Sequence, residues 1–558
     1  MSGDPSGEAG HSGHGRGLSA GETRRRLLGA AAGLASPLPA LTGAVIVAAP
    51  GSAAAQATSL DLRPAVLPLK EDDTVAPGYA RDLLIRWGDR VTADAPPWNP
   101  RQPNAAAAET QFGWDGRIVD IVPVPAAADA VPRALLAVAH PTVDPAMAFP
   151  GGVDRPAVAA AMQGASLLNI ERQGDRWLVV DGGYQSRRLT ANTLCRVSGP
   201  AAGGLGGAVR GLLNVTGGCT TPWGTLLLTE GEPRGWLTRL QGWEGRFADP
   251  LGFGWMVELD PMDPGAVPVK RTALGRFPHG DAVAALTRDG RAVVYMSDHR
   301  AAGHLMRFTS HGPARGTDAL DRGVLAVAVL EGERLRWADL PDGADALLDP
   351  SALAGRQGAP PPFDLPSGLA LGPNGGRLTL ACRGQPGGGE PGGSAGGRPR
   401  AGGVLQVMPA GGDHGADTAL LRPLLTGGYP GRFSPIGTTW PEHPDTVVLD
   451  GNGRAWIGTD RGGRIGGAPD GLFGCDTEGP GRGLPLPLYG APRGAAVGGS
   501  ALSPDGTALF AVVRTPGAEP GASWDRPGTR WPGFDGNQPP RTALVAFSRL
   551  RGGPVGGA

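Results

Sequence analysis

The chain has 558 residues, and its 51 lysines and arginines are balanced by 52 aspartates and glutamates. This near-zero net charge excludes a strongly basic surface, so neither nucleic acid nor an anionic membrane is a predicted partner. The 95 glycines and 56 prolines indicate many turns, and recurrent apolar runs favour a turn-rich all-β protein over a disordered chain. The cysteines lie far apart without a Cys-x-x-Cys pair, and they predict neither a zinc site nor a dense disulfide framework: Cys195, Cys219, Cys382 and Cys475.

Residues 1–57 are typical of a targeting segment. A polar, glycine-rich leader, predicted to be disordered, precedes three arginines at 24–26 and a weakly apolar stretch that ends at Ala55-Gln56-Ala57. This pattern predicts a twin-arginine signal peptide; an uncleaved membrane anchor is the alternative, but prolines interrupt the apolar run. No other stretch is apolar enough to span a bilayer. We therefore expect the mature protein, exported by the twin-arginine machinery, to be periplasmic or extracellular.

The rest of the chain, residues 58–558, repeats one unit: a tight turn, an apolar strand and a polar residue where the strand ends. The unit occurs near residues 131, 221, 287, 372, 449 and 503. Most copies have Asn-Gly, Asp-Gly or a similar pair before the β-forming residues, as in a hairpin. Six copies at irregular intervals predict a six-bladed β-propeller with long inserted loops, and a pair of β-sandwiches is the alternative. Residues 384–403, rich in glycine and proline, are predicted to be a flexible insertion.

Polar residues at the ends of the repeated strands are the first candidates for a site. In a propeller these strand ends converge on one end of the central channel, so distant residues can face one another. The alternative is that strands end in polar residues because they end in solvent. The residues concerned are His140, Glu230, Asp298, Asp460 and Arg514.

Rival chemistries find little support. The chain has no G-x-S-x-G elbow, no P-loop and no H-E-x-x-H motif. His299 and His304 follow a repeated strand and are interpreted as loop histidines rather than metal ligands. The stretch DGNGR at 450–454 lacks the acidic residues of a calcium loop and is better interpreted as a hairpin turn.

An ordered series of segments resembles the PhoX family of secreted alkaline phosphatases. The series begins with VAPGYARDLLIRWGD (75–89), and its most specific member is GFGWMVELDPMDPGAVPVKRTALGRFPHGDA (252–282). It continues with FDLPSGLALGPNGG (363–376), PDTVVLDGNGRAWIGTD (444–460) and GGSALSPDGTALFAVVRTPG (498–517). The resemblance covers nearly the whole mature chain, and the order of the segments carries it more than any single motif.

The resemblance implies a fold, an activity and a metal centre. Members of the family are six-bladed propellers exported by the twin-arginine route, and they hydrolyse phosphomonoesters at a cluster of two iron and three calcium ions. A cysteine thiolate binds iron, and carboxylates are shared among the metals. Calcium prefers carboxylate oxygens, and ferric iron accepts carboxylate together with thiolate. The cluster would neutralise the phosphate oxygens while an activated oxygen attacks phosphorus.

The sequence departs from the family at several ligand positions. Val215 replaces the family's cysteine, and Cys219 lies four residues later. Pro141 and Gly280 stand where the family has glutamates, Ser367 ends a lost Arg-Pro-Glu, and Thr515 replaces a histidine. Asp445 and Asp298 match. Because a cluster of divalent ions needs negative charge, the sequence predicts at most a reduced site. Its expected metal ligands are Glu230, Glu232, Asp445, Asp281 and, for iron, Cys219.

Three functions compete at this stage. The first is a metal-dependent phosphomonoesterase with an altered calcium and iron site, favoured by the resemblance. The second is a propeller without catalysis that serves as a binding or scaffold protein, favoured by the missing carboxylates. The third is a propeller hydrolase that uses one calcium ion on another ester. The sequence predicts no catalytic residue, no particular substrate and no oligomeric state.

Overall fold

A computed structural model describes residues 58–125, 128–315, 318–384, 401–428, 439–462 and 468–557, together with the backbone of 394–395 and 398–399. The predicted leader and signal peptide lie outside the described residues, as does most of the predicted insertion at 384–403. Gly403, the last residue of that insertion, begins strand β23. Among the described residues, no helix is long and apolar enough to cross a membrane.

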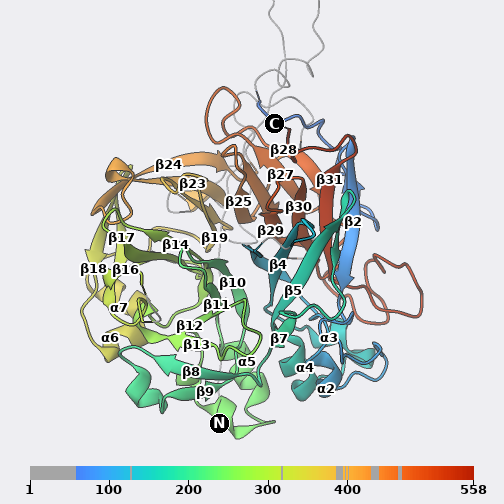
Figure 1. Ribbon diagram of the computed structural model, residues 1–558, viewed down its shortest axis with the longest axis horizontal. Coiled ribbons are helices and arrows are strands. Elements are labelled where there is room, and N and C mark those ends of the chain that lie inside the picture. Colours follow the sequence, from blue (N-terminus) through green and yellow to red (C-terminus); the bar gives the residue numbers. More distant parts are fainter. Residues whose placement is uncertain are drawn as a thin grey trace, which may run out of the picture. The chain divides into compact units, whose positions relative to one another are not determined.

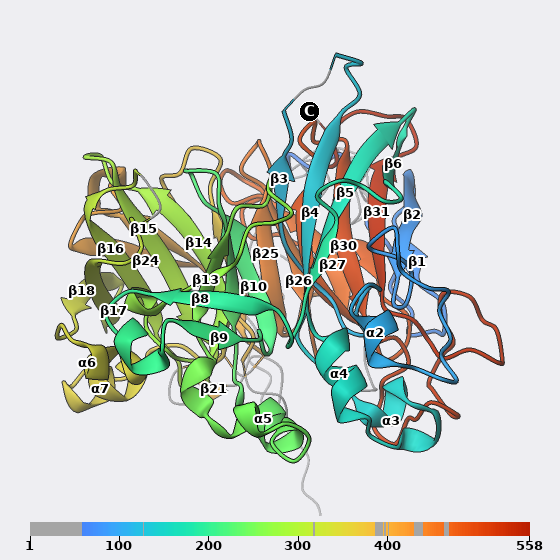
Figure 2. The same cartoon turned by 60° about the horizontal axis from the view of Figure 1, so that its bottom comes forward.

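The described chain is mostly β-structure, in several largely antiparallel sheets (Figures 1 and 2). The first sheet contains β3 (Arg117–Pro123), β4 (Arg133–His140), β5 (Gly164–Gln173), β6 (Arg176–Val179) and β7 (Arg187–Leu189). The second contains β10 (Val215–Thr220), β11 (Leu226–Glu230), β12 (Met256–Leu259), β13 (Val269–Arg271), β8 (Leu194–Ser198) and β9 (Ala208–Arg210). Strand β8 is parallel to β13, whereas the other neighbours in these two sheets are antiparallel.

The third sheet has nine strands, because two smaller sheets join at their outer strands. One half contains β14 (His279–Leu286), β15 (Arg291–Asp298), β16 (Leu305–Pro313), β17 (Gly323–Glu331) and β18 (Arg334–Asp339). The other contains β19 (Pro366–Leu371), β20 (Leu378–Cys382), β23 (Gly403–Pro409) and β24 (Thr418–Thr426). The join is the antiparallel pair β18 and β24, in which Arg334 lies opposite Leu420.

Two further sheets hold both ends of the described chain. One contains β25 (Pro444–Leu449), β26 (Ala455–Thr459), β27 (Gly471–Cys475), β28 (Leu486–Gly490) and the early strand β1 (Thr74–Val75). The other contains β29 (Ala496–Leu502), β30 (Ala508–Arg514), β31 (Ala543–Arg549) and β2 (Tyr79–Arg86). Since β2 pairs with β31, the first and last long strands of the described chain stabilise each other. The short strands β21 (Ser394–Ala395) and β22 (Arg398–Pro399) pair separately.

Helices are short, and none of those described exceeds seven residues. The α-helices are α2 (Ala105–Ala108), α3 (Pro145–Ala148), α4 (Pro156–Met162), α5 (Arg234–Leu240), α6 (Ala344–Leu348) and α7 (Pro350–Arg356). They lie in loops between strands, and residues of α2, α3, α4 and α5 form one apolar core. Other apolar cores consist mainly of strand residues from neighbouring sheets. One such core packs Ile118 and Leu136 of the first sheet against Phe510 of β30.

Each of the six repeated units predicted from the sequence contains a strand: β4, β11, β15, β20, β26 and β30. Each of these second strands pairs antiparallel with the strand before it, which we call a first strand: β3, β10, β14, β19, β25 and β29. Five of the six turns, all except the one between β3 and β4, carry a glycine with φ between about 60° and 95°, such as Gly290, Gly453 and Gly506. Residues with a side chain rarely adopt this conformation, which explains the Asp-Gly and Asn-Gly pairs of the repeat.

The first strands contact one another in the order β3, β10, β14, β19, β25 and β29, and β29 contacts β3. Figure 1 shows the labelled first strands toward the middle and outer strands such as β2 and β18 at the periphery. A cavity of about 230 Å³, the central cavity, is lined by residues from all six first strands, including Asp120, Cys219, Asp281 and Ser500. One end of this arrangement, which we call the strand-end face, is where the first strands begin and the second strands end.

Candidate functional site

The polar strand ends predicted from the sequence lie on the strand-end face, but only some of them contact one another. His140, Glu230, Asp298 and Arg514 are the last residues of their strands, and Asp460 directly follows β26. Arg514 Nη1 lies 2.8 Å from Asp460 Oδ2. The ring of His140 forms hydrogen bonds through Nδ1 with the Asp115 carbonyl, at 2.6 Å, and through Nε2 with Ser166 Oγ, at 2.7 Å.

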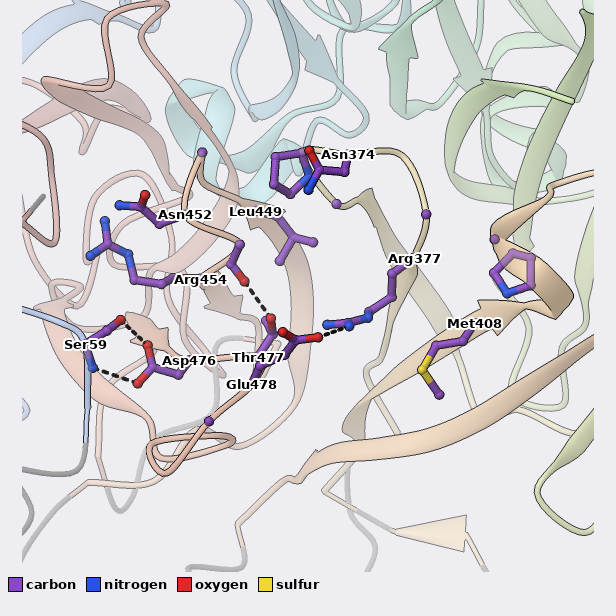
Figure 3. A pocket seen from close by; sticks show the side chains of 18 of the residues that line it. Ser59, Asn374, Arg377, Met408, Leu449, Asn452, Arg454, Asp476, Thr477 and Glu478 are labelled. Atoms are coloured by element: carbon purple, nitrogen blue, oxygen red, sulfur yellow. Dashed lines mark hydrogen bonds and ion pairs between the residues drawn. The ribbon is translucent and has the colours of Figure 1, made fainter. Parts of the chain in front are cut away.

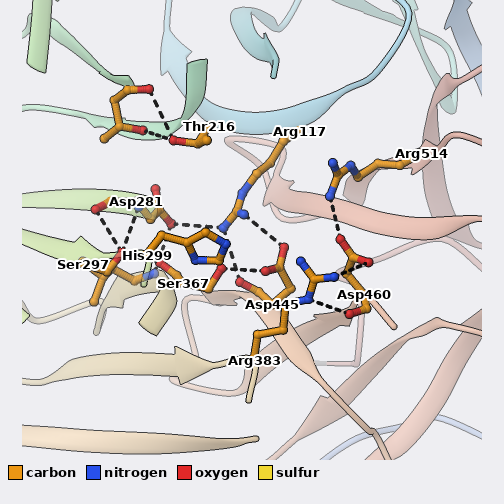
Figure 4. Close-up of polar contacts among 12 residues, drawn as sticks. Arg117, Thr216, Asp281, Ser297, His299, Ser367, Arg383, Asp445, Asp460 and Arg514 are labelled. Carbon is orange, nitrogen blue, oxygen red and sulfur yellow. Dashed lines mark hydrogen bonds and ion pairs between the residues drawn. The ribbon is translucent and has the colours of Figure 1, made fainter. Parts of the chain in front are cut away.

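A network of arginines and aspartates links several sheets on this face (Figure 4); it consists of two ion-paired groups, which interact through the charges of Arg383 and Arg514 on Asp445. Its members, the arginine–aspartate network, are Arg117, Arg383, Arg514, Asp115, Asp281, Asp445 and Asp460. Asp460 accepts from Arg514 and, at 3.1 Å, from Arg383. Arg514 also donates to both carboxylate oxygens of Asp115, at 2.9 and 2.8 Å. Paired, hydrogen-bonded charges of this kind are the form in which buried ions are tolerated.

Arg117 contacts two acids from different sheets, Asp445 and Asp281, and the sequence analysis predicted both as metal ligands. Its Nη1 lies 3.0 Å from Asp445 Oδ2, and its Nη2 lies 3.9 Å from Asp281 Oδ2. Ser367 Oγ donates to the other oxygen of Asp445 at 2.6 Å. Burial raises the pKa of Asp445, but the charges of Arg117 and Arg383 outweigh it and hold that pKa well below its usual range. The carboxylate of Asp445 is therefore already neutralised by guanidinium groups.

Asp281 bridges three neighbouring first strands. Its Oδ1 accepts the backbone N–H of Gly218 on β10 at 2.9 Å, and its Oδ2 accepts that of Leu369 on β19 at 3.0 Å. Neighbouring first strands share no ladder hydrogen bonds, so this side chain supplies polar links between sheets. Burial raises the pKa of Asp281 to about 6, although Arg117 and the backbone N–H groups oppose the change.

Glu230 is fully buried and its oxygens are occupied. Lys270 Nζ lies 3.0 and 2.9 Å from its two oxygens. The backbone N–H groups of Leu213, Gly254 and Trp255 also donate to them at 2.8 to 3.0 Å. Lys270 is itself fully buried, so the pair forms one neutral unit. A metal ion could bind Glu230 only by displacing this lysine.

Glu232 lies at the surface, apart from Glu230. Its carboxylate is paired with Arg234, whose Nε and Nη2 lie 2.9 and 2.8 Å from its oxygens. Partial burial raises the pKa of Glu232, but the hydrogen bonds from Arg234 lower it by more. The pKa therefore lies below its usual value. The two glutamates at the end of β11 and just after it therefore have separate partners.

Cys219 lies on β10, packed in an apolar cluster with Leu227, Met256 and Ala282. Burial, assisted by the negative charges of Asp120 and Asp281, raises the pKa of its thiol well above the usual value. A thiol that resists ionisation is a poor iron ligand, because metals bind the thiolate. The other three cysteines are also buried.

The residues present do not fit a centre of five metal ions. Among the described residues, no group of three or more histidine, cysteine, aspartate or glutamate side chains could hold a metal ion. Between residues 58 and 558, the undescribed stretches add only one residue of these types, Glu390. The five ligands predicted from the sequence are thus not brought together as one metal-binding group, and four of them already have cationic partners.

The sequence analysis did not identify Arg117, Arg383 and Asp115 as site residues. The available signal was the position of Arg117, which begins the strand of the segment FGWDGRIVDIVPV. A cation at the start of a first strand faces the same end as the acids at the ends of second strands. This signal depends on knowing that β3 is a first strand, which its sequence does not reveal.

A further cavity, of about 670 Å³, lies away from the strand-end face (Figure 3). It is lined by the turns between β19 and β20 and between β25 and β26. Its charged side chains have partners: Arg377 pairs with Glu478, and Asp476 Oδ2 accepts the backbone N–H of Ser59 at 2.8 Å. We find no group there that the sequence analysis connected with catalysis.

Comparison with known proteins places these observations in a family. The family model described as alkaline phosphatase PhoX matches residues 60–517. The structure of Pseudomonas fluorescens PhoX in complex with vanadate, a transition-state analogue, is similar with a TM-score of 0.79 and 27% identity, covering 89% of this chain and 99% of that one.

More distant matches add no argument. A gluconolactonase from Xanthomonas campestris has a TM-score of 0.31 and 14% identity over 83% of this chain and 99% of that one. A Trichoderma reesei carbohydrate-active enzyme of family AA12 has 0.33 and 9% over 87% and 99%. No curated protein matches. The family model covers most of the sequence, and the chain therefore belongs to the PhoX alkaline phosphatase family.

Proposed function

We propose that this chain is an exported PhoX-family protein that binds phosphate esters but lacks the metal-dependent hydrolysis that its family membership implies. One observation carries the proposal: the guanidinium of Arg117 lies between Asp281 and Asp445, two of the acids expected to bind metal. A cation of the protein itself thus supplies the positive charge there. Two further arginines neutralise Asp115 and Asp460.

We also propose that the sheets form a closed six-bladed propeller. The contacts among first strands, which return from β29 to β3, support this arrangement. So does a central cavity lined by all six of them, and so does the similarity to Pseudomonas fluorescens PhoX. Export by the twin-arginine route to the periplasm or beyond rests on the arginine cluster and the Ala-x-Ala site of residues 1–57.

A metal-dependent phosphomonoesterase with a reduced calcium or iron site is the second candidate. Family membership over residues 60–517 favours it. It requires Asp281 or Asp445 to exchange Arg117 for a metal ion, and Glu230 to exchange Lys270. Each exchange would leave a buried cation without its partner, which typically costs several kcal/mol.

Metal analysis and turnover separate the two candidates. The protein is purified from a host that exports it folded, its iron and calcium are measured, and p-nitrophenyl phosphate turnover is followed with and without a chelator. Pseudomonas fluorescens PhoX, prepared in the same way, is the positive control. We expect no stoichiometric metal and no turnover above the buffer. Bound iron or calcium together with chelator-sensitive turnover would overturn the proposal in favour of the second candidate.

A further inference from the structure

A pocket lined by three arginines lies on the strand-end face beside the second and third sheets. Its volume is about 330 Å³, which is large enough for a small ligand. Arg234 comes from the loop after β11 and the start of α5, Arg276 from the segment before β14, and Arg300 from the loop after β15. Three separate segments therefore bring guanidinium groups to one cavity, which we call the arginine pocket.

Arg276 is held in place by the backbone. Its Nε donates to the Phe253 carbonyl at 2.8 Å, and its Nη2 donates to the Pro250 carbonyl at 2.9 Å. Carbonyl groups fix the orientation of a guanidinium without cancelling its charge, and its planar fork suits carboxylate and phosphate oxygens. Arg276 is thus a preorganised donor rather than half of an ion pair.

Arg300 is positioned but weakly paired. Its Nε lies 3.5 Å from Asp298 Oδ1, and its Nη1 lies 3.7 Å from Asp349 Oδ1, both longer than a good charge-assisted hydrogen bond. Asp298 is fully buried and is anchored by Ser351 Oγ at 2.7 Å. Its Oδ1 has no hydrogen-bond partner among the described residues. Asp298 therefore orients the guanidinium of Arg300 from the buried side, and the N–H groups of Arg300 stay available to a ligand.

The acids at the rim of the pocket form exposed ion pairs that a ligand can replace. Glu232 pairs with Arg234, whose side chain is 81% exposed, and the side chain of Asp349 is 56% exposed. Exposed ion pairs contribute little and exchange partners readily. A ligand with two negative charges could thus replace Glu232 on Arg234, and the displaced carboxylate would turn into water. On Arg300 it could replace Asp349, which keeps the backbone N–H of Ala352, at 3.2 Å, as its partner at the start of α7.

We infer that the arginine pocket binds a dianionic oxyanion, such as the phosphate group of a small phosphomonoester, through Arg276, Arg300 and Arg234. Arginine is preferred where bidentate recognition of phosphate matters. Phe277 and Leu348 in the lining offer an apolar surface to an organic substituent. This inference rests on the proposed phosphate-ester binding, and it places the ligand in the arginine pocket rather than at the arginine–aspartate network, whose arginines are more fully neutralised.

Calorimetric titration of the whole mature protein with inorganic phosphate and with phenyl phosphate tests the inference. We expect Arg300→Gln to weaken binding at least tenfold, because it loses a charged fork. Arg300→Lys, which keeps the charge but loses the fork, should weaken binding less. Arg336→Gln is the matched control, since Arg336 is an exposed arginine paired with Glu331 outside the pocket, and it should bind as the parent does. Thermal unfolding of each variant checks that it is folded.

The outcomes separate this inference from the proposed function. No binding of either ligand to the parent protein overturns the inference, and so does an unchanged affinity in Arg300→Gln. If Arg383→Gln weakens binding and Arg300→Gln does not, the ligand binds at the network, and the arginine pocket is wrong while the proposed function stands. If metal-dependent turnover is found, the proposed function fails, but the effect of Arg300→Gln still decides whether this pocket holds the phosphate.

Discussion

The two sides of the strand-end face neutralise buried acids in different ways. On the side of β3, β25 and β30, arginines from different sheets pair with Asp115, Asp445 and Asp460. On the side of β11 and β13, a single lysine of the same sheet and three backbone N–H groups enclose Glu230. The first solution ties sheets together, and the second completes one sheet. Neither leaves a carboxylate with the free oxygens that a metal centre requires.

Breaking the buried pair of Glu230 and Lys270 should have the largest effect on stability. Lys270→Met removes the only cation paired with Glu230 in the described structure, and it should lower the free energy of unfolding by about 3 to 5 kcal/mol, the usual result of leaving a buried charge unpaired. Denaturant unfolding measures the change. The double variant Lys270→Met with Glu230→Gln should recover much of the loss. A loss below about 1 kcal/mol in the single variant would contradict the assigned pairing.

The network should be more tolerant, because its acids share several cations. Arg117→Met leaves Asp445 with the more distant charge of Arg383 and the hydrogen bond from Ser367. We expect a loss of about 2 to 3 kcal/mol in unfolding free energy, below that of Lys270→Met. The control is Arg133→Met, because Arg133 lies near the surface, where it pairs with Asp129 and, at 3.3 Å, with Glu171, and its cost should be clearly smaller than that of Arg117→Met. An equal cost for the Arg117 and Arg133 variants would mean that the network contributes nothing beyond a surface pair.

Asp281 gives the network a pH dependence of defined sign. Its pKa in the folded protein is about 6, above its usual value of 3.8, so the folded state favours the protonated acid. The stabilisation is fully present below pH 3.8 and is lost as the pH rises through 6. The shift corresponds to about 3 kcal/mol at most.

The measurement is the difference in unfolding free energy between the parent and Asp281→Asn at pH 5 and pH 8. This difference isolates Asp281 from Asp470, whose pKa burial raises to about 7. Asparagine cannot ionise, so the unfolding free energy of the variant should rise relative to that of the parent as the pH rises from 5 to 8. A difference independent of pH would show that Asp281 titrates normally.

Much of the fold followed from local sequence, and the identity of the charge partners did not. The six repeated strands were predictable, because each has a turn with a glycine or a similar signal and a run of β-forming residues. Their polar ends were also predictable. The partners depend on contacts across the fold: Arg117 and Asp445 are 328 residues apart in the sequence. The join of β18 to β24 had no local signal either.

The same limit explains the predicted metal ligands. Glu230 ends a second strand, and Asp281 and Asp445 lie near the beginnings of first strands on the same face. Their positions alone are compatible with metal binding. Lys270, the N–H groups around Asp281 and Arg117 occupy their oxygens in the described structure, and the motifs, although they contain Lys270, do not reveal these contacts. A sequence pattern locates a carboxylate on a face, but the three-dimensional neighbours determine whether its oxygens are free.

Cys219 provides the smallest and most selective test, because it distinguishes the apolar core from the polar face beside it. Cys219→Ala removes one sulfur atom from a packed cluster and should lower the unfolding free energy by about 1 kcal/mol, without changing metal content. In the parent, the buried thiol should react with a thiol reagent only after unfolding, since reaction requires an exposed thiolate. Cys195, Cys382 and Cys475, also buried, should behave alike. A thiol that reacts in the folded protein and is lost in Cys219→Ala would place Cys219 on the polar side of the strand, where a metal could reach it.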